Sequence, residues 1–237
     1  MPEQGERLLA VVPARGGSKG VKRKNIADVC GKPLLAFTLE PALACVAAGQ
    51  LTRLIVSTDD AEIATVARAF GAETPFLRPP ELATDTAKSS GLLLHALEEE
   101  EKRGAAYDAV MLLQPTSPLR SGADFAGALE LWRQRTPSSE SLISVYREEY
   151  VNDIVAYGRR GNIGVPKHPL HNRGVRRQEH EALYIRNGAF YITDAAFLRR
   201  TSLIVSDAPL LYDMPRSRSL NIDTEEDLAY LRWIMCK

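Results

Sequence analysis

The sequence lacks the features of several large protein classes. No hydrophobic run approaches the ~20 residues needed to cross a membrane. Residues 1–7 include two glutamates and no apolar core, so we expect no signal peptide and a cytoplasmic protein. There is no excess of either charge, because 30 basic residues balance 30 acidic ones. A general nucleic-acid binder usually carries a basic surplus, so we expect neither nucleic acid nor membrane as a partner.

Cysteine is scarce, and its spacing is uninformative. The three cysteines are Cys30, Cys45 and Cys236, an odd number spread widely along the chain. No C-x-x-C pair occurs, so the pattern indicates neither a zinc site nor a disulfide framework. We therefore expect reduced thiols, as is usual in the cytoplasm.

Short apolar runs alternate with helical patterns along the chain. The strands that we expect are Leu8–Val12, Leu54–Ser57, Phe76–Leu77, Ala109–Leu113, Ser141–Val145, Gly188–Thr193 and an edge strand at Leu210–Met214. The expected helices are Leu34–Ala48, Ala61–Phe70, Ser89–Arg103, Gly122–Gln134, Asp194–Arg200 and Thr224–Met235. This order predicts an α/β fold in which helices cover both faces of a mostly parallel, Rossmann-like sheet.

Residues 146–186 interrupt the alternation. This stretch is polar, with scattered glycine, proline and basic residues, and it suits an inserted β-arm, a lid or a dimerisation element. With no repeat and no clear linker, we expect residues 1–237 to form one domain that carries this arm.

The loop after the first strand carries the strongest chemical signal. Its glycines allow backbone amides to face an anion, and Arg15, Lys19 and Lys24 add positive charge. The loop matches neither the Walker A pattern nor the G-x-G-x-x-G fingerprint. A solvated basic turn is the alternative, but the position after a buried strand favours binding of a triphosphate.

The run VVPARGGSKGVKRKN, residues 11–25, resembles the N-terminal signature of the acylneuraminate cytidylyltransferases, or CMP-sialic acid synthetases. Further blocks follow in the family's order: GKPLL (31–35), VSTDD (56–60), RPPELATDTA (78–87), LLQPTSPLR (112–120), RRQ (176–178), NGAFYI (187–192) and NIDTEED (221–227). The resemblance thus spans nearly the whole chain. It implies a three-layer nucleotidyltransferase fold and transfer of CMP from CTP to a nine-carbon sugar acid, in a homodimer.

The resemblance also implies the roles of individual residues. The nucleotide site would comprise Ala14, Arg15, Gly16, Lys19, Lys24, Asn25, Arg78 and Ser89. Gln114, Arg177 and Tyr191 would contact the sugar acid, and Asp223, with Asn221 beside it, would hold Mg²⁺. Arg15, Lys19, Lys24 and Asp223 would be the catalytic residues: the three cations would offset charge on the departing pyrophosphate, and Asp223 would bind the magnesium ion.

Most of these positions also fit a purely structural role. Asp59 and Asp60 suit a cap of the helix at Ala61, and Asp85 with Thr86 suits a turn. Gln114 would simply end its strand, Arg177 would be solvated, and Tyr191 would lie in the core. Asp223 would be a favourable charge before a capping box, Thr224 to Asp227.

The sequence departs from the family pattern in two places. Asn221 stands where the family often has a second aspartate, which leaves the number of protein ligands of the metal open. Family members that use common sialic acids tend to carry a lysine after the strand at Ser141–Val145, whereas none occurs here between Tyr146 and Pro166, which leaves the acceptor open. N-acetylneuraminate, legionaminate, pseudaminate and Kdo all remain candidates. A hexose-1-phosphate nucleotidyltransferase and a non-catalytic nucleotide-binding protein are the rival hypotheses.

Overall fold

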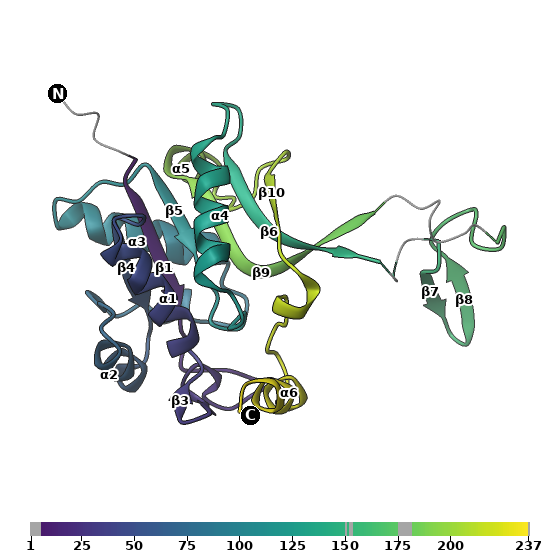
Figure 1. Ribbon diagram of the computed structural model, residues 1–237, viewed down its shortest axis with the longest axis horizontal. Helices are drawn as coiled ribbons and strands as arrows, with labels where there is room; N and C mark the ends of the chain where they lie inside the picture. Colours follow the sequence, from purple (N-terminus) through teal and green to yellow (C-terminus); the bar gives the residue numbers. More distant parts are fainter. Residues whose placement is uncertain (1–5, 150, 152–153, 175–181, 237) are drawn as a thin grey trace.

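The computed structural model describes residues 6–149, 151, 154–174 and 182–236 of the chain. A six-stranded sheet in the order β10-β6-β9-β5-β1-β4 forms its centre (Figure 1). The strands are β1 (Leu8–Pro13), β4 (Arg53–Ser57), β5 (Ala109–Leu112), β6 (Ser141–Glu148), β9 (Leu183–Asp194) and β10 (Leu210–Asp213). Strand β9 runs antiparallel to β5 and β6, and the other pairs are parallel. The mostly parallel sheet is therefore confirmed.

Helices cover both faces of the sheet. Those that pack on it are α1 (Ala36–Ala47), α2 (Ala61–Ala69), α3 (Ser89–Lys102), α4 (Gly122–Arg133) and α5 (Ala195–Thr201), and α6 (Glu225–Met235) packs elsewhere. Successive side chains of a strand point to opposite faces, so β1 contributes Leu8, Ala10 and Val12 to one core with α1, α2 and α4. Leu9 and Val11 join α3 and α5 in a second core. This arrangement confirms the three-layer α/β fold.

A third, smaller core joins the first loop to the C-terminal helix. Val21, Val29 and Leu34 pack there against residues of the C-terminal segment, among them Ile222 and Leu228. A small hairpin of β2 (Asp28–Val29) and β3 (Lys32–Pro33), which the sequence did not predict, carries part of this core. The N-terminal loop and the C-terminal segment thus form one unit.

The expectation of three reduced thiols is wrong for one pair. Cys30, in the turn of this hairpin, forms a disulfide with Cys236 at the end of α6, with their Cα atoms 5.4 Å apart. The two residues are separated by 206 positions in the sequence, so only the third core brings them together. Cys45 is a buried free thiol.

The interrupted stretch begins and ends inside the sheet. Strands β6 and β9 extend beyond their predicted bounds and pair with each other from Val145–Arg186 to Glu148–Leu183. Beyond them, β7 (Tyr157–Arg160) and β8 (Ile163–Pro166) form a hairpin that projects from the body (Figure 1).

Two further observations complete the fold. The strand predicted at Phe76–Leu77 is wrong, because only Leu77 makes an isolated bridge, to Thr58. Within the described ranges, no helix combines the length and apolar character needed to span a membrane.

Candidate active site

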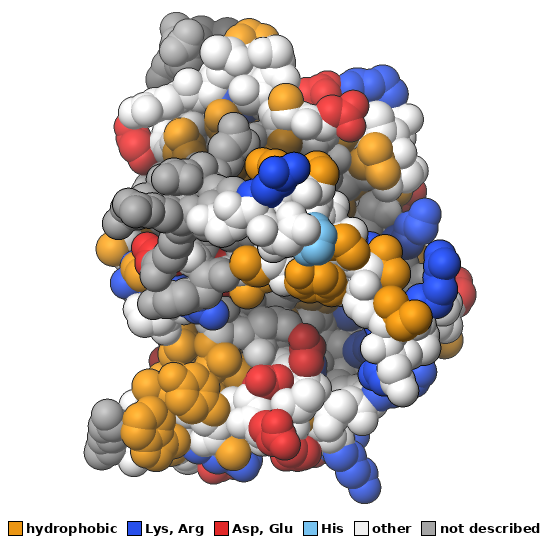
Figure 2. Space-filling model, turned by 90° about the vertical axis from the view of Figure 1, so that its right-hand side faces the viewer, with side chains coloured by type: hydrophobic (Ala, Val, Ile, Leu, Met, Phe, Trp, Pro, Cys, Tyr) orange, Lys and Arg blue, Asp and Glu red, His pale blue; other side chains and the backbone are white. Residues whose placement is uncertain are grey.

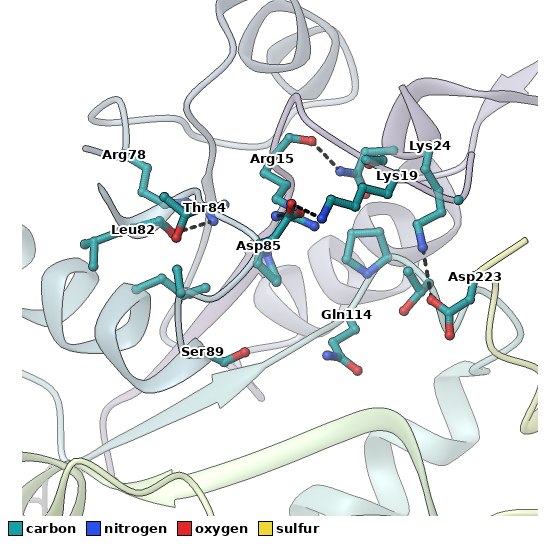
Figure 3. Close-up of a pocket in the computed structure, with 18 residues that line it drawn as sticks. Arg15, Lys19, Lys24, Arg78, Leu82, Thr84, Asp85, Ser89, Gln114 and Asp223 are labelled. Atoms are coloured by element: carbon teal, nitrogen blue, oxygen red, sulfur yellow. Dashed lines mark hydrogen bonds and ion pairs between the residues drawn. The ribbon is translucent and has the colours of Figure 1, made fainter. Parts of the chain in front are cut away.

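A cavity of about 450 Å³ opens where β1 and β5 end at their carboxyl sides. Ligands of parallel α/β sheets usually bind at this edge. Of the predicted site residues, Arg15, Lys19, Lys24, Asn25, Arg78, Ser89, Gln114 and Asp223 line the cavity (Figure 3). They come from five separate segments of the chain, which the fold brings to one place.

Close backbone packing holds the first loop beside the C-terminal segment. A Cβ atom on Gly20 would lie 2.0 Å from the carbonyl oxygen of Asp223, so only glycine permits this approach. Asn25 is buried, and its Nδ2 atom donates to the carbonyl oxygen of Arg15 over 3.0 Å. In this arrangement Asn25 shapes the loop that carries the cations.

On one wall of the cavity, a single carboxylate bridges two cations. Asp85 accepts from Arg15 Nη1 at 2.9 Å and from Lys19 Nζ at 2.6 Å (Figure 3). The hydrogen bond from Lys19 is the largest influence on the pKa of Asp85, and together with the bond from Arg15 it outweighs the opposing effect of burial and lowers that pKa. The local sequence predicts only a turn at Asp85. Its place seven residues after Arg78, in the same block, was the available signal.

On the opposite wall, Lys24 is fixed more firmly. Its Nζ atom lies 2.6 Å from the carbonyl oxygen of Ile222 and 3.2 Å from Asp223 Oδ1. Asn221 Nδ2 lies 2.5 Å from Asp223 Oδ2, so the amide donates to the carboxylate and its nitrogen faces it. Both oxygens of Asp223 therefore have a partner.

The predicted capping box before α6 is confirmed. Thr224 accepts from the backbone of Asp227, and Asp227 accepts from the backbone of Thr224. Asp227 Oδ2 also accepts from the Asp223 backbone N–H over 2.9 Å. The cap thus holds the backbone of Asp223 while its side chain reaches the cavity, so the structural role and the site role are compatible.

Arg78 lines the cavity, but its guanidinium is buried and already hydrogen-bonded to other residues of the protein. It is buried and donates to the side chain and the carbonyl oxygen of Ser57 and to the carbonyl oxygen of Leu82. Burial lowers its pKa to about 10, against the opposing effect of Asp59. These bonds tie the segment before α3 to the end of β4.

Gln114 follows β5, and a glycine in a distant motif makes room for it. Gly188 has a φ of +77°, and a Cβ atom there would lie 2.4 Å from Gln114 Oε1. The buried guanidinium of Arg120 donates to the carbonyl oxygens of Gln114 and Ser117 and so holds the turn that follows β5. Blocks that are far apart in the sequence therefore position one side chain.

Five predicted residues lie outside the lining of this cavity or outside the described chain. The backbone N–H of Ala14 donates to Ser57, and that of Gly16 donates to Asp59 Oδ1. Tyr191 packs against the second core, and burial raises its pKa. Asn221 contacts the site through Asp223. Arg177 lies outside the described residues.

The helix-cap role is confirmed for Asp60. Its side chain accepts from the backbone N–H groups of Glu62 and Ile63 at the start of α2. Asp59 instead accepts from Gly16 and so anchors the first loop to the end of β4.

Comparisons with known proteins agree with this geometry. A family model described as cytidylyltransferase matches residues 9–200. A pseudaminic acid cytidylyltransferase from Campylobacter jejuni is 32% identical, covering 94% of each chain. A CMP-N,N'-diacetyllegionaminic acid synthase from Legionella pneumophila is 33% identical over 97% of this chain and 96% of its own. An N-acylneuraminate cytidylyltransferase from Escherichia coli is 33% identical over 93% of this chain and 50% of its own.

A solved structure extends the similarity to three dimensions. The structure of CMP:2-keto-3-deoxy-manno-octonic acid synthetase complexed with CTP superposes with a TM-score of 0.71 at 17% identity. The match covers 97% of this chain and 98% of that one, so the two share a fold. The family model and the Campylobacter and Legionella relatives show that the chain belongs to the cytidylyltransferase family.

Proposed function

We propose that this protein transfers CMP from CTP to the anomeric hydroxyl of a nonulosonic acid and releases pyrophosphate. The observation that carries the proposal is the convergence of Arg15, Lys19 and Lys24 on one cavity at the carboxyl edge of the sheet. A triphosphate needs several fixed cations, and the relatives named above are cytidylyltransferases for sugar acids of this class.

The reaction asks the protein mainly for positioning and charge. The sugar hydroxyl oxygen forms a bond to the α-phosphorus and gives its proton to water, while the bond from that phosphorus to the bridging oxygen breaks and pyrophosphate leaves. Arg15, Lys19 and Lys24 neutralise the charge that accumulates on the departing pyrophosphate. Gln114, which lines the cavity at the start of the turn after β5, would orient the reacting groups.

We further propose that Asp223 holds a Mg²⁺ ion together with the phosphates of CTP. Among the described residues there is no cluster of three or more metal-binding side chains. We therefore do not propose a site in which protein ligands alone surround the ion. Magnesium commonly takes one or two carboxylates plus substrate phosphates, and the exposed carboxylate of Asp223 fits this donor set. When bound, the ion would withdraw charge from the phosphates. Asn221 would hold the carboxylate in place, because its amide nitrogen faces Asp223.

The acceptor within this class is the finer part of the proposal. Our starting hypothesis is N-acylneuraminate, and the pseudaminic and legionaminic acid relatives have nearly the same identity to this chain. Pyrophosphate release should be measured with CTP, Mg²⁺ and each of N-acetylneuraminate, pseudaminate, legionaminate, Kdo and a hexose 1-phosphate. Release with one of the three nine-carbon acids supports the proposal. Release only with a hexose 1-phosphate would contradict it.

We also propose a homodimer that forms through the projecting hairpin. Tyr157, Ile163 and Val165 on β7 and β8 are 53%, 70% and 42% exposed, and Figure 2 views the molecule from this side, where hydrophobic side chains lie at the surface. Burial of these side chains against a second copy would stabilise the arm. Light scattering at micromolar concentration should give twice the chain mass, and Ile163→Asp should shift it towards the monomer. A monomeric mass for the unmodified protein would contradict this proposal.

We place the reaction in the cytoplasm, where CTP is made. Cell fractionation followed by the pyrophosphate-release assay tests this. Activity in the cytosolic fraction supports the proposal, and activity confined to the membrane or secreted fraction would contradict it.

A further inference from the structure

Acidic side chains of the cavity pair with three of its four cations. Four basic and two acidic side chains line it. Asp85 contacts Arg15 and Lys19, and Asp223 contacts Lys24. The side chain of Asp85 is thus bound to two of the three cations that the proposed function assigns to the triphosphate.

The contacts of Asp85 match those that a phosphate group would make. One carboxylate oxygen takes Arg15 Nη1 at 2.9 Å, and the other takes Lys19 Nζ at 2.6 Å. Phosphate oxygens seek the same donors and bind them through charge-assisted hydrogen bonds. Because Asp85 itself carries a negative charge, a triphosphate at this wall would be repelled while the carboxylate stayed in place.

The segment that carries Asp85 is suited to give way. Residues 83–88 form neither helix nor strand between Leu82 and α3, and Thr84, Asp85 and Thr86 are all exposed. Lys19 is 79% exposed and Asp85 is 41% exposed, and ion pairs between such groups are weak and easily exchanged. The segment leads directly into Ser89, another residue of the cavity lining, so movement of Asp85 would also shift Ser89.

Resting on the proposed function, we propose that Asp85 is a placeholder for the triphosphate. It holds Arg15 and Lys19 toward the cavity in the empty enzyme, and the phosphates of CTP displace it. Asp85 therefore positions the phosphate-binding cations and lowers the affinity for CTP at the same time.

The test is calorimetric titration of CTP into the wild type, Asp85→Asn and Glu81→Gln, each with EDTA and with Mg²⁺ at low salt. Asp85→Asn keeps the shape of the side chain, and its melting temperature checks the fold. Without the competing charge, it should bind CTP roughly 3- to 10-fold more tightly under both conditions. Glu81→Gln makes the same charge change on an exposed residue outside the cavity and should bind like the wild type.

Unchanged or weaker binding by Asp85→Asn would overturn the inference. Weaker binding only with Mg²⁺ would instead make Asp85 a metal ligand and would equally overturn it. Inorganic tripolyphosphate, titrated in parallel, separates this inference from the proposed function. If the wild type binds tripolyphosphate but not CTP, the proposed function fails, while tighter tripolyphosphate binding by Asp85→Asn still supports the placeholder. If it binds neither probe, both fail.

Discussion

The two walls of the cavity use the same pair of chemical groups in different ways. Lys24 is only 13% exposed, and it is tied to a carbonyl oxygen as well as to Asp223, whose second oxygen is held by Asn221. Lys19, by contrast, is 79% exposed, and Asp85 is the one partner that the structure gives it among the described residues. The surroundings of an ion pair therefore decide how firmly its side chains are held. Further bonds fix the Lys24–Asp223 pair at its place in the cavity, whereas the exposed Lys19–Asp85 pair is available for exchange with a ligand.

The largest effect should follow from loss of the fixed cation. Lys24→Ala removes charge beside the departing pyrophosphate and also releases Ile222 and Asp223, so we expect kcat/KM to fall roughly 100- to 1000-fold. The melting temperature should fall as well. Pyrophosphate release and thermal melting measure the two effects. Lys22→Ala, in the same loop but outside the cavity lining, is the control, and an equal loss there would argue against a specific role.

Loss of the exposed cation should separate activity from stability. Lys19→Ala should lower kcat/KM by about 10- to 100-fold, because a phosphate ligand is removed. Its melting temperature should stay near that of the wild type, since exposed ion pairs contribute only about 0–1 kcal/mol. Nearly unchanged activity would mean that the loop is not the phosphate site.

The carboxylate of the fixed wall should govern the metal requirement. Asp223→Asn replaces a charged oxygen ligand with a neutral one, so the Mg²⁺ concentration for half-maximal rate should rise roughly 10-fold or more. A Mg²⁺ titration at saturating CTP measures this, and retention of CTP binding in EDTA shows that the cavity is intact. If only the melting temperature changes, Asp223 serves the helix terminus alone.

The disulfide between Cys30 and Cys236 should affect the free energy of unfolding more than the catalytic rate. Reduction of Cys30–Cys236, or Cys236→Ser, removes a link across 206 residues and should lower stability by about 2–4 kcal/mol. Denaturant unfolding with and without reductant measures the loss, with Cys45→Ser unfolded under the same conditions to show that the reductant acts on the pair. Equal stability in both states would mean that the third core alone holds α6.

The smallest effect concerns pH. Hydrogen bonds, first from Lys19, lower the pKa of Asp85, so its carboxylate stays charged well below neutrality. The ion pairs of Asp85 with Arg15 and Lys19 are therefore present throughout neutral pH and disappear only when the pH falls through that lowered pKa. The ratio of CTP affinities between Asp85→Asn and the wild type should stay constant from about pH 6 to pH 8. A ratio that changes over this range would indicate a different titrating group.

Local patterns predicted much of the frame. The apolar runs at Leu8–Val12 and Ala109–Leu113 became buried central strands, because strands covered on both faces must be apolar throughout. The capping box at Thr224 formed as its spacing indicates. Ligands of such sheets bind at the carboxyl ends of the strands, and the first loop does line the cavity at that edge, as predicted.

Two contacts that the sequence did not predict join distant segments. The pairing of Cys30 with Cys236 requires the third core, and the contact of Asp85 with Lys19 joins segments 66 residues apart, so in both cases the partner lies outside any local window. Strands β7 and β8 pair locally, but they are short and exposed and therefore lack the alternating pattern that reveals a half-buried strand.

The most direct test of the account is the identity of the product formed from CTP and each sugar acid, determined by phosphorus NMR and mass spectrometry. The account predicts a sugar joined to CMP through one phosphodiester phosphorus, with one equivalent of pyrophosphate. A diphosphate-linked nucleotide sugar made from a sugar phosphate, or CTP binding with no product from any nonulosonic acid, would contradict it.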